Sequence, residues 1–244
     1  MTNSREIATQ IFTEISGKKK FFETVISGNK DFNRLDQRDK AFVKLVVLGT
    51  LRRNGQIQKV IQKLIKTPLK KRNLFILNLI KISICQILFL GIKEYSVVNT
   101  AVEISKKYKL EKFVNGVLRN ICRKKKELNR QIEFESNIPT WISNDVIKNL
   151  GGKYIKKLSD ILTKEPPIDI KIKRNYLAKL DWEKILNGKF VANDVLRVKS
   201  NGPIEKKPYF DLGYWWIQGI SSSLPVRFIS EIFKKEKKEN ISLL

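Results

Sequence analysis

The sequence of 244 residues has no histidine, only two cysteines, and no glycine-rich phosphate-binding motif. Without an imidazole there is no Ser-His-Asp triad, no Cys-His dyad and no histidine metal ligand. Cys85 and Cys122 are too few for a usual zinc site or for a disulfide framework, so we expect no metal and a cytoplasmic location. Neither GxxxxGK[ST] nor GxGxxG occurs. The residues themselves therefore indicate no active site and no cofactor loop.

A secretory leader and a membrane span are also missing from the pattern. The N-terminus MTNSREIATQIF lacks the charged-then-apolar order of a signal peptide. The most apolar run, residues 74–92, is about as long as a membrane span but carries Asn78, Lys81 and Gln86. A charge at mid-membrane depth costs roughly 3 kcal/mol, and in a helix these three polar residues fall within an arc of about 140°. The run predicts a buried helix of a bundle.

Positive charge is what the sequence has in excess. There are 49 Lys and Arg against 24 Asp and Glu, a net charge of +25, and residues 1–130 alone hold 29 against 10, a net charge of +19. Such a domain repels itself unless a polyanion shares its surface, so RNA or DNA is the natural partner and an anionic membrane surface is the rival. Lys outnumbers Arg by 37 to 12, as expected of an AT-rich genome, so the Arg positions are the more informative.

Apolar spacing divides the chain near residue 130. Residues 1–130 repeat apolar side chains at three- and four-residue intervals, which predicts an all-helical bundle. The predicted bundle helices include one capped by Asp36 and ending near Arg53, one capped by Ser96, and those at about 56–65, 72–90 and 110–126. Residues 131–244 predict helices near 140–150, 154–163 and 222–234, a short helix around Trp182, and strands at 168–173 and 195–199. The predicted fold is mostly α, with a smaller α+β domain at 131–244.

The last bundle helix is the most informative for function. One face carries Phe113, Val117 and Leu118, and another carries cations that include Arg119 and Arg123, at a spacing that suits phosphates. A solvated face without any ligand explains the row equally well. Arg52 and Arg53 form a second cluster, although cations at a helix end also favour the helix dipole. Cys122 borders the basic run 123–126, which could lower its pKa, but a packed thiol is the favoured interpretation.

Four motifs of the first half resemble the NusB family of RNA-binding helical domains. Residues 35–53 (LDQRDKAF to LGTLRR) are similar to its "DRA…GxLR" signature. CQILFL (85–90) resembles its "YQLLFL" helix, YSVVNTAV (95–102) its "AVNEAV" element, and FVNGVLR (113–119) its "FVNAVLR" helix. Each match is weak alone, but the four follow in order.

Three motifs of the second half resemble the RsmB-type (Sun/Fmu) enzymes, which are cytosine-5 methyltransferases of small-subunit ribosomal RNA. IPTWI (138–142), IKRN (172–175) and GYWWIQ (213–218) are similar to their "P-x-W-[LI]", "LRxN" and "GxWxVQD" elements, and Gly219 stands where the family has Asp. The family continues with a Rossmann-like domain that binds S-adenosylmethionine and supplies two catalytic Cys. Residues 241–244 look like the start of its first strand, and neither Cys matches a catalytic position, so we expect no catalytic residue and no cofactor in this chain.

The resemblance predicts that the chain is the RNA-binding N-terminal part of such a methyltransferase. Its predicted partners are ribosomal RNA and a separate or downstream methyltransferase domain. Whether the chain acts as an enzyme stays open, because a frameshift product would regain the activity from sequence further on. The alternative is a stand-alone NusB-like antitermination factor that regulates transcription. The predicted RNA-binding residues are Arg38, Arg52, Arg53, Arg119, Arg123, Lys124, Lys125, Lys126, Arg174 and Asn175.

Overall fold

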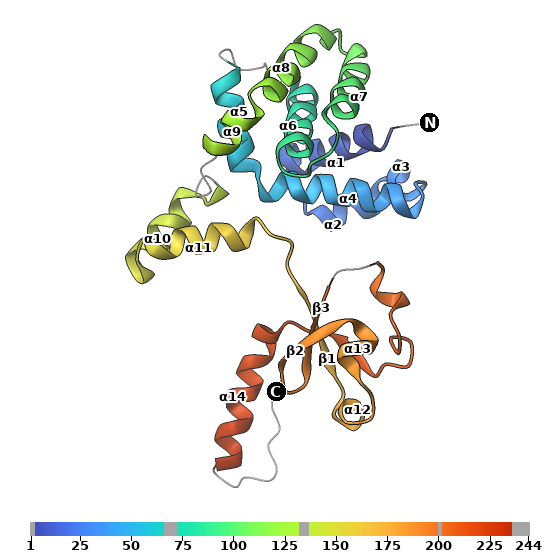
Figure 1. The fold of residues 1–244 in the computed structure, drawn as a ribbon, viewed down its shortest axis with the longest axis vertical. Helices are drawn as coiled ribbons and strands as arrows, with labels where there is room; N and C mark the ends of the chain where they lie inside the picture. Colours follow the sequence, from blue (N-terminus) through green and yellow to red (C-terminus); the bar gives the residue numbers. More distant parts are fainter. Residues whose placement is uncertain (1–2, 66–72, 132–136, 200–201, 236–244) are drawn as a thin grey trace. The chain divides into compact units, whose positions relative to one another are not determined.

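The computed structural model describes residues 3–65, 73–131, 137–199 and 202–235. The chain forms two compact units, Met1–Lys164 and Glu165–Leu244. The first unit consists of helices, and the second combines short helices with a sheet (Figure 1). The predicted fold class, a helical bundle followed by an α+β part, is therefore confirmed.

The first unit is built around one central helix. Its helices, in chain order, are α1 (Ser4–Lys18), α2 (Phe22–Gly28), α3 (Lys30–Asn33), α4 (Gln37–Arg52), α5 (Asn54–Leu64), α6 (Leu74–Leu88), α7 (Glu94–Lys106), α8 (Glu111–Arg123), α9 (Lys125–Gln131), α10 (Thr140–Leu150) and α11 (Lys153–Leu162). Helix α6 contacts α1, α4, α5, α7 and α8 (Figure 1). Its strongly apolar sequence is buried by these neighbours, as predicted.

Helix α6 contributes to two apolar clusters. Ile84 packs with residues of α5, α7 and α8, whereas Ile82 packs with residues of α1 and α4. Two polar residues of the run form hydrogen bonds with α1: the Asn78 amide nitrogen donates to Thr13 Oγ1 at 3.1 Å, and Gln86 Oε1 accepts from Arg5. Hydrogen bonding removes much of the cost of burying an amide. No helix within the described ranges is long and apolar enough to cross a membrane.

Two helix limits follow local chemistry, and one of them differs from the prediction. Asp36 caps α4 as predicted, because its Oδ1 accepts from the Asp39 N–H at 2.7 Å. The predicted Ser96 cap is wrong: α7 already begins at Glu94, and Ser96 Oγ accepts from Arg5 instead. The helix predicted over 110–126 is interrupted at Lys124, where α8 ends and α9 follows.

The first unit ends at Lys164, whereas the sequence analysis put the domain boundary near residue 130. Helices α10 and α11 pack against each other within the first unit. The segment before α10 is joined to the bundle by Asn137, whose Oδ1 accepts from the Gln56 N–H at 3.0 Å. The net positive charge falls after residue 130, but the chain remains in the first unit up to Lys164.

The second unit centres on a four-stranded antiparallel sheet of order β2-β3-β1-β4. Its elements are β1 (Ile168–Ile172), α12 (Arg174–Leu177), α13 (Trp182–Leu186), β2 (Gly188–Ala192), β3 (Val195–Val198), the 3-10 helix η3 (Ile204–Lys206), β4 (Trp215–Ile217) and α14 (Ile220–Lys235). In the register of the sheet, Ile170 pairs with Leu196 on one side and with Ile217 on the other. The core gathers Trp182 and Trp215 against these strands.

Two strands and the short helix around Trp182 were predicted, and two strands were missed. The alternation at 168–173 identified β1, and the strand predicted at 195–199 corresponds to β3, but β2 and β4 carry no alternating pattern. Helix α14 is attached to the sheet by the Arg227–Asp194 ion pair and by the Ile220 N–H, which donates to Asp169 Oδ2 at 3.1 Å. The strand start predicted at 241–244 lies outside the described residues.

Candidate nucleic-acid interface

Helix α8 presents an apolar face to the bundle and two arginines to solvent. Val114, Leu118 and Ile121 are completely buried against α6 and α7, while Arg119 and Arg123 are exposed one turn apart. This is the division of faces that the sequence predicted. It leaves two guanidinium groups in a row on the outside of a rigidly packed helix, the arrangement that phosphate contacts require.

Each of these arginines is held along the helix by an asparagine one turn earlier. Arg119 Nε donates to Asn115 Oδ1 at 2.9 Å, and Arg123 Nη2 donates to Asn120 Oδ1 at 3.1 Å. A guanidinium has five N–H donors, so each arginine keeps most of its donors for another ligand. The asparagines thus orient the two cations without neutralising them.

The lysines that follow do not act as a uniform row. Lys125 Nζ forms an ion pair with Glu94 at 2.9 Å, across to the start of α7. Lys124 and Lys126 are exposed and have no partner among the described residues. The sequence predicted all three as RNA contacts, but the charge of Lys125 is already balanced by a carboxylate.

The predicted residues of α4 are separated by the structure. Arg38 is exposed at the start of α4, and Arg52 is half-buried at its end, about 20 Å away at 1.5 Å per residue. Arg53 is half-buried: its guanidinium stacks 4.5 Å from the centroid of the Phe89 ring and donates to Gln56 Oε1 at 3.2 Å. Burial lowers the pKa of Arg53 from its ordinary value. Arg53 therefore fixes the corner between α4 and α5.

The connection between α6 and α7 brings two of the basic clusters to one region. Arg53 stacks on Phe89, and Lys125 forms an ion pair with Glu94, at the two ends of this connection. Lys63 of α5 also donates to Gln131 of α9 at 3.3 Å. The α4–α5 corner and the α8–α9 junction thus both contact the α6–α7 connection, although the two are some 70 residues apart in the sequence.

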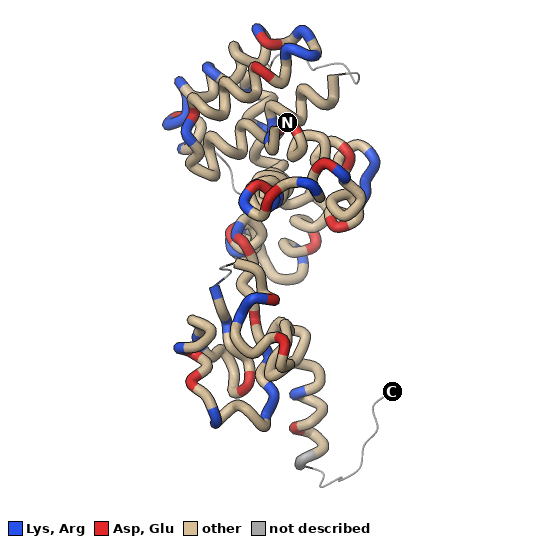
Figure 2. Tube along the Cα trace, turned by 90° about the vertical axis from the view of Figure 1, so that its right-hand side faces the viewer, with Lys and Arg blue, Asp and Glu red and all other residues tan. Residues whose placement is uncertain are grey.

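Sequence reasoning missed two cations in the first unit. Lys93 is exposed on the same α6–α7 connection and has no partner within the described ranges. A single lysine in a turn carries no periodic signal that could have identified it. Arg5 is half-buried and ties α1 to α6 and α7 through Gln86 and Ser96. Figure 2 shows Lys and Arg spread over both units, so the charge excess is broader than any one cluster.

In the second unit, Arg174 and Asn175 are the first two residues of α12 and both side chains are exposed. Neither has a partner among the described residues. The structure thus leaves both free for a ligand.

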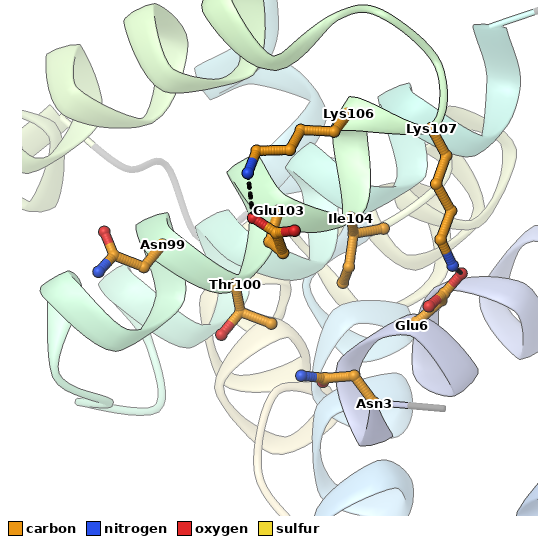
Figure 3. A pocket seen from close by; sticks show the side chains of 8 residues that line it. All are labelled: Asn3, Glu6, Asn99, Thr100, Glu103, Ile104, Lys106 and Lys107. Carbon is orange, nitrogen blue, oxygen red and sulfur yellow. Dashed lines mark hydrogen bonds and ion pairs between the residues drawn. The ribbon is translucent and has the colours of Figure 1, made fainter. Parts of the chain in front are cut away.

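A shallow pocket of about 630 Å³ lies between the start of α1 and helix α7 (Figure 3). Its charges are paired with one another: Lys107 Nζ lies 2.7 Å from Glu6 Oε1, and Lys106 Nζ lies 2.6 Å from Glu103 Oε2. A pocket whose carboxylates and ammonium groups already neutralise each other offers little to a charged ligand.

Neither cysteine has the environment of a reactive thiol. Burial raises the pKa of Cys85 to about 11. Burial, with the adjacent Glu94 carboxylate, raises the pKa of Cys122 to about 11 as well. The basic run does not lower the pKa of Cys122, because burial and the Glu94 carboxylate outweigh the effect of Lys125, and the thiol packs against the bundle core as the favoured interpretation had it. Among the described residues no group of three or more His, Cys, Asp or Glu could hold a metal ion.

The first unit is thus a helical bundle that carries two oriented, exposed arginines on the outer face of α8. The NusB family model matches residues 2–123, half of the chain, so the chain belongs to the NusB family. The match ends at Arg123, the last residue of α8, and includes all the helices from α1 to α8.

The similarity to individual proteins extends through the second unit. The ribosomal RNA small subunit methyltransferase B of Cronobacter sakazakii is 22% identical over 233 residues, which cover 90% of this chain and 54% of that protein. The methyltransferase of the same name from Erwinia tasmaniensis is 25% identical over 235 residues, covering 91% and 54%. This homology to RsmB-type methyltransferases confirms the resemblance seen in the motifs. The chain spans about half the length of the curated relatives it matches.

A solved structure shares the fold. The crystal structure of PH0851 superposes with a TM-score of 0.56 at 15% identity, over 92% of this chain and 55% of that one. At this identity the likeness concerns the fold alone, and it includes both units of the chain.

Proposed function

We propose that this chain binds small-subunit ribosomal RNA as the RNA-gripping part of an RsmB-like cytosine-5 methyltransferase. The proposal draws on the relatives, which are named for that RNA and that reaction. Methyl transfer itself is assigned to the Rossmann-like domain and not to residues 1–244. A cytoplasmic location is part of the proposal, since its RNA partner is found there.

The observation that carries the proposal is the outer face of α8 and its junction with α9. Arg119 and Arg123 are exposed and oriented by asparagines, and Lys124 and Lys126 follow without partners among the described residues. Phosphates of a folded RNA are met by such a cationic row on a rigid helix. The first unit therefore grips the RNA backbone, and Arg174 and Asn175 of the second unit add contacts near the modified strand.

Salt dependence tests the proposal. If about six cations contact phosphates, the association constant for a ribosomal RNA fragment falls as roughly the fifth power of the salt concentration. Fluorescence anisotropy titrations at increasing salt measure this slope. An affinity that does not change up to physiological ionic strength would contradict the proposal.

Two neighbouring lysines provide a matched comparison. Lys126→Gln removes a free cation, so the salt slope should fall by about one. Lys125→Gln combined with Glu94→Gln removes an ion pair at unchanged net charge, and the slope should stay as in the unaltered chain. Equal slopes for the two variants would show that Lys126 makes no phosphate contact.

Cofactor binding separates this function from that of a complete enzyme. We propose that residues 1–244 bind no S-adenosylmethionine, so isothermal titration with this cofactor should give no heat. Heat of binding would place the cofactor site within these residues.

A stand-alone antitermination factor would bind transcription-complex proteins, whereas the proposed function predicts capture of ribosomal RNA precursors. The similarity over about 90% of the chain, well past residue 123, favours the methyltransferase relationship.

A further inference from the structure

Three tyrosines of the second unit form one stack of nearly parallel rings. The rings of Tyr209 and Tyr214 have centroids 5.3 Å apart at 15°, and those of Tyr214 and Tyr176 are 3.8 Å apart at 6°. Trp182 closes the inner end, with its ring edge-on to Tyr209 at 5.6 Å. Tyr176 is thus the outermost ring of an ordered aromatic stack.

Tyr176 is half-buried, and a lysine is the cation that lies over the outer face of its ring. Tyr214 occupies one face of the ring, so the Lys179 ammonium, 5.4 Å from the ring centroid, lies over the other. Lys179 is exposed and has no carboxylate partner within the described part of the chain. A lysine side chain has four rotatable bonds, so it can leave the ring face at little cost.

The backbone under the stack is fixed by hydrogen bonds. Trp182 Nε1 donates to the carbonyl oxygen of Tyr176 at 2.9 Å, and the Lys173 N–H donates to the carbonyl oxygen of Tyr214 at 3.0 Å. Tyr209 has a φ of 65°, in the left-handed region that a bulky side chain rarely adopts. Uncommon backbone conformations of this kind cluster at binding sites, where the surrounding structure holds them.

The surroundings of Tyr176 are cationic and polar. Arg174 and Asn175 precede it in α12 with exposed, unpartnered side chains in the described structure, and the Lys173 ammonium lies beside Gly213. A half-buried aromatic ring beside cations suits a nucleobase with its phosphate. Lysine, in contrast, is depleted at protein–protein interfaces.

We propose that the outer face of Tyr176 is a stacking site for one base of single-stranded RNA. The base extends the tyrosine stack, and Lys179 moves from the ring to the adjoining phosphate. Arg174 and Asn175 contact the sugar-phosphate backbone beside it. This inference rests on the proposed function for the identity of the ligand as RNA, and it adds a base contact to a grip made otherwise of phosphate contacts.

Photocrosslinking of the full chain tests the contact directly. A short single-stranded uridine oligonucleotide with one iodouridine is bound and irradiated, and the crosslinked peptide is identified by mass spectrometry. Because iodouridine crosslinks to aromatic rings on which it stacks, we expect the adduct on Tyr176. Adducts confined to residues 3–164 would overturn the inference.

Two substitutions at Tyr176 give a matched pair. Tyr176→Leu removes the ring and should weaken binding of the oligonucleotide by about 5- to 150-fold, the range for loss of one stacked base. The salt slope should not change, because no charge is lost. Tyr176→Phe keeps the ring and should bind as the unaltered chain. Should the leucine variant fail to fold, as judged by circular dichroism, the crosslink on the unaltered chain decides.

The outcomes separate this site from the proposed function. If Tyr176→Leu binds as tightly as the unaltered chain while Lys126→Gln still lowers the salt slope, the stacking site is wrong and the RNA grip of α8 stands. If the unaltered chain binds RNA without any salt dependence, the proposed function fails. If Tyr176 is still crosslinked in that case, the stacking site is supported although the proposed function is not.

Discussion

Arg5 offers the sharpest test of how the first unit is held together. Its Nε donates to Gln86 Oε1 at 2.8 Å, its Nη2 donates to Ser96 Oγ at 3.1 Å, and its guanidinium lies 5.2 Å from the centroid of the Phe42 ring. One side chain of α1 thus contacts α6, α7 and α4. Replacing Arg5 with Met keeps the apolar stem and removes both hydrogen bonds and the cation–ring contact.

The cost of Arg5→Met follows from the partner that is left behind. Gln86 is 1% exposed, so its Oε1 would lose its hydrogen bond where water has little access. An unsatisfied buried acceptor costs about 1–3 kcal/mol. The ring contact of a half-exposed arginine adds about 0.5–1 kcal/mol, and the Ser96 bond is partly replaced by water. We expect a loss of about 3 kcal/mol in the free energy of unfolding.

Urea unfolding followed by far-ultraviolet circular dichroism measures this loss, since most of the helix lies in the first unit. A destabilisation of this size lowers the melting temperature by roughly 6–12 °C for a unit of this length. Arg5→Lys keeps the charge but not the two-nitrogen geometry, so its stability should be intermediate. If Arg5→Met unfolds at the same urea concentration as the unaltered chain, the buried acceptor is satisfied in some other way and the reasoning fails.

Two further predictions concern titratable groups. At about pH 8 the native chain should resist alkylation at Cys85 and Cys122, whose pKa values are raised to about 11, and mild urea should expose both; rapid native labelling of Cys122 would contradict its burial beside Glu94. Arg197 holds the pKa of Asp169 below its ordinary value. Asp169 therefore stabilises the second unit above the ordinary Asp pKa of about 3.9, and this contribution is lost as pH falls through the lowered value. Arg197→Met should remove that part of the acid sensitivity, as followed by tryptophan fluorescence.

The helical half was predictable because its signals are local. Apolar residues at three- and four-residue spacing identify a helix without knowledge of its neighbours, and Asp36 marks a cap by its own side chain. The division of α8 into a buried and an exposed face followed from the same spacing. Such features need only the geometry of one helix.

The role of each cation was not predictable, because it depends on partners distant in the sequence. Lys125 and Lys126 are adjacent and chemically identical, yet only Lys125 meets Glu94, 31 residues earlier. Arg53 is occupied by Phe89 in the same way. A sequence pattern shows which residues carry charge, but the fold decides which of those charges are already balanced.

The missed strands have a similar explanation. Residues 189–191 of β2 are all exposed, so the strand lacks the alternation that marks a half-buried strand. Strand β4 has three residues and exists through its pairing with β1, where Trp215 is opposite Ile172. Pairing of this kind between distant segments leaves no periodic trace in the sequence.

Helix α10 provides a final prediction, because several of its large apolar side chains are exposed. Trp141 is 75% exposed, and Ile147 and Leu150 are exposed as well. We therefore expect Trp141→Gln to leave the free energy of unfolding within about 0.5 kcal/mol of the unaltered chain, as for other surface substitutions. Trp182 is 1% exposed, so Trp182→Ala should cost about 3–5 kcal/mol. Urea titrations of both variants decide the matter. A large decrease in the free energy of unfolding for Trp141→Gln would mean that the chain covers this face in solution, since an exposed indole has no packing to lose.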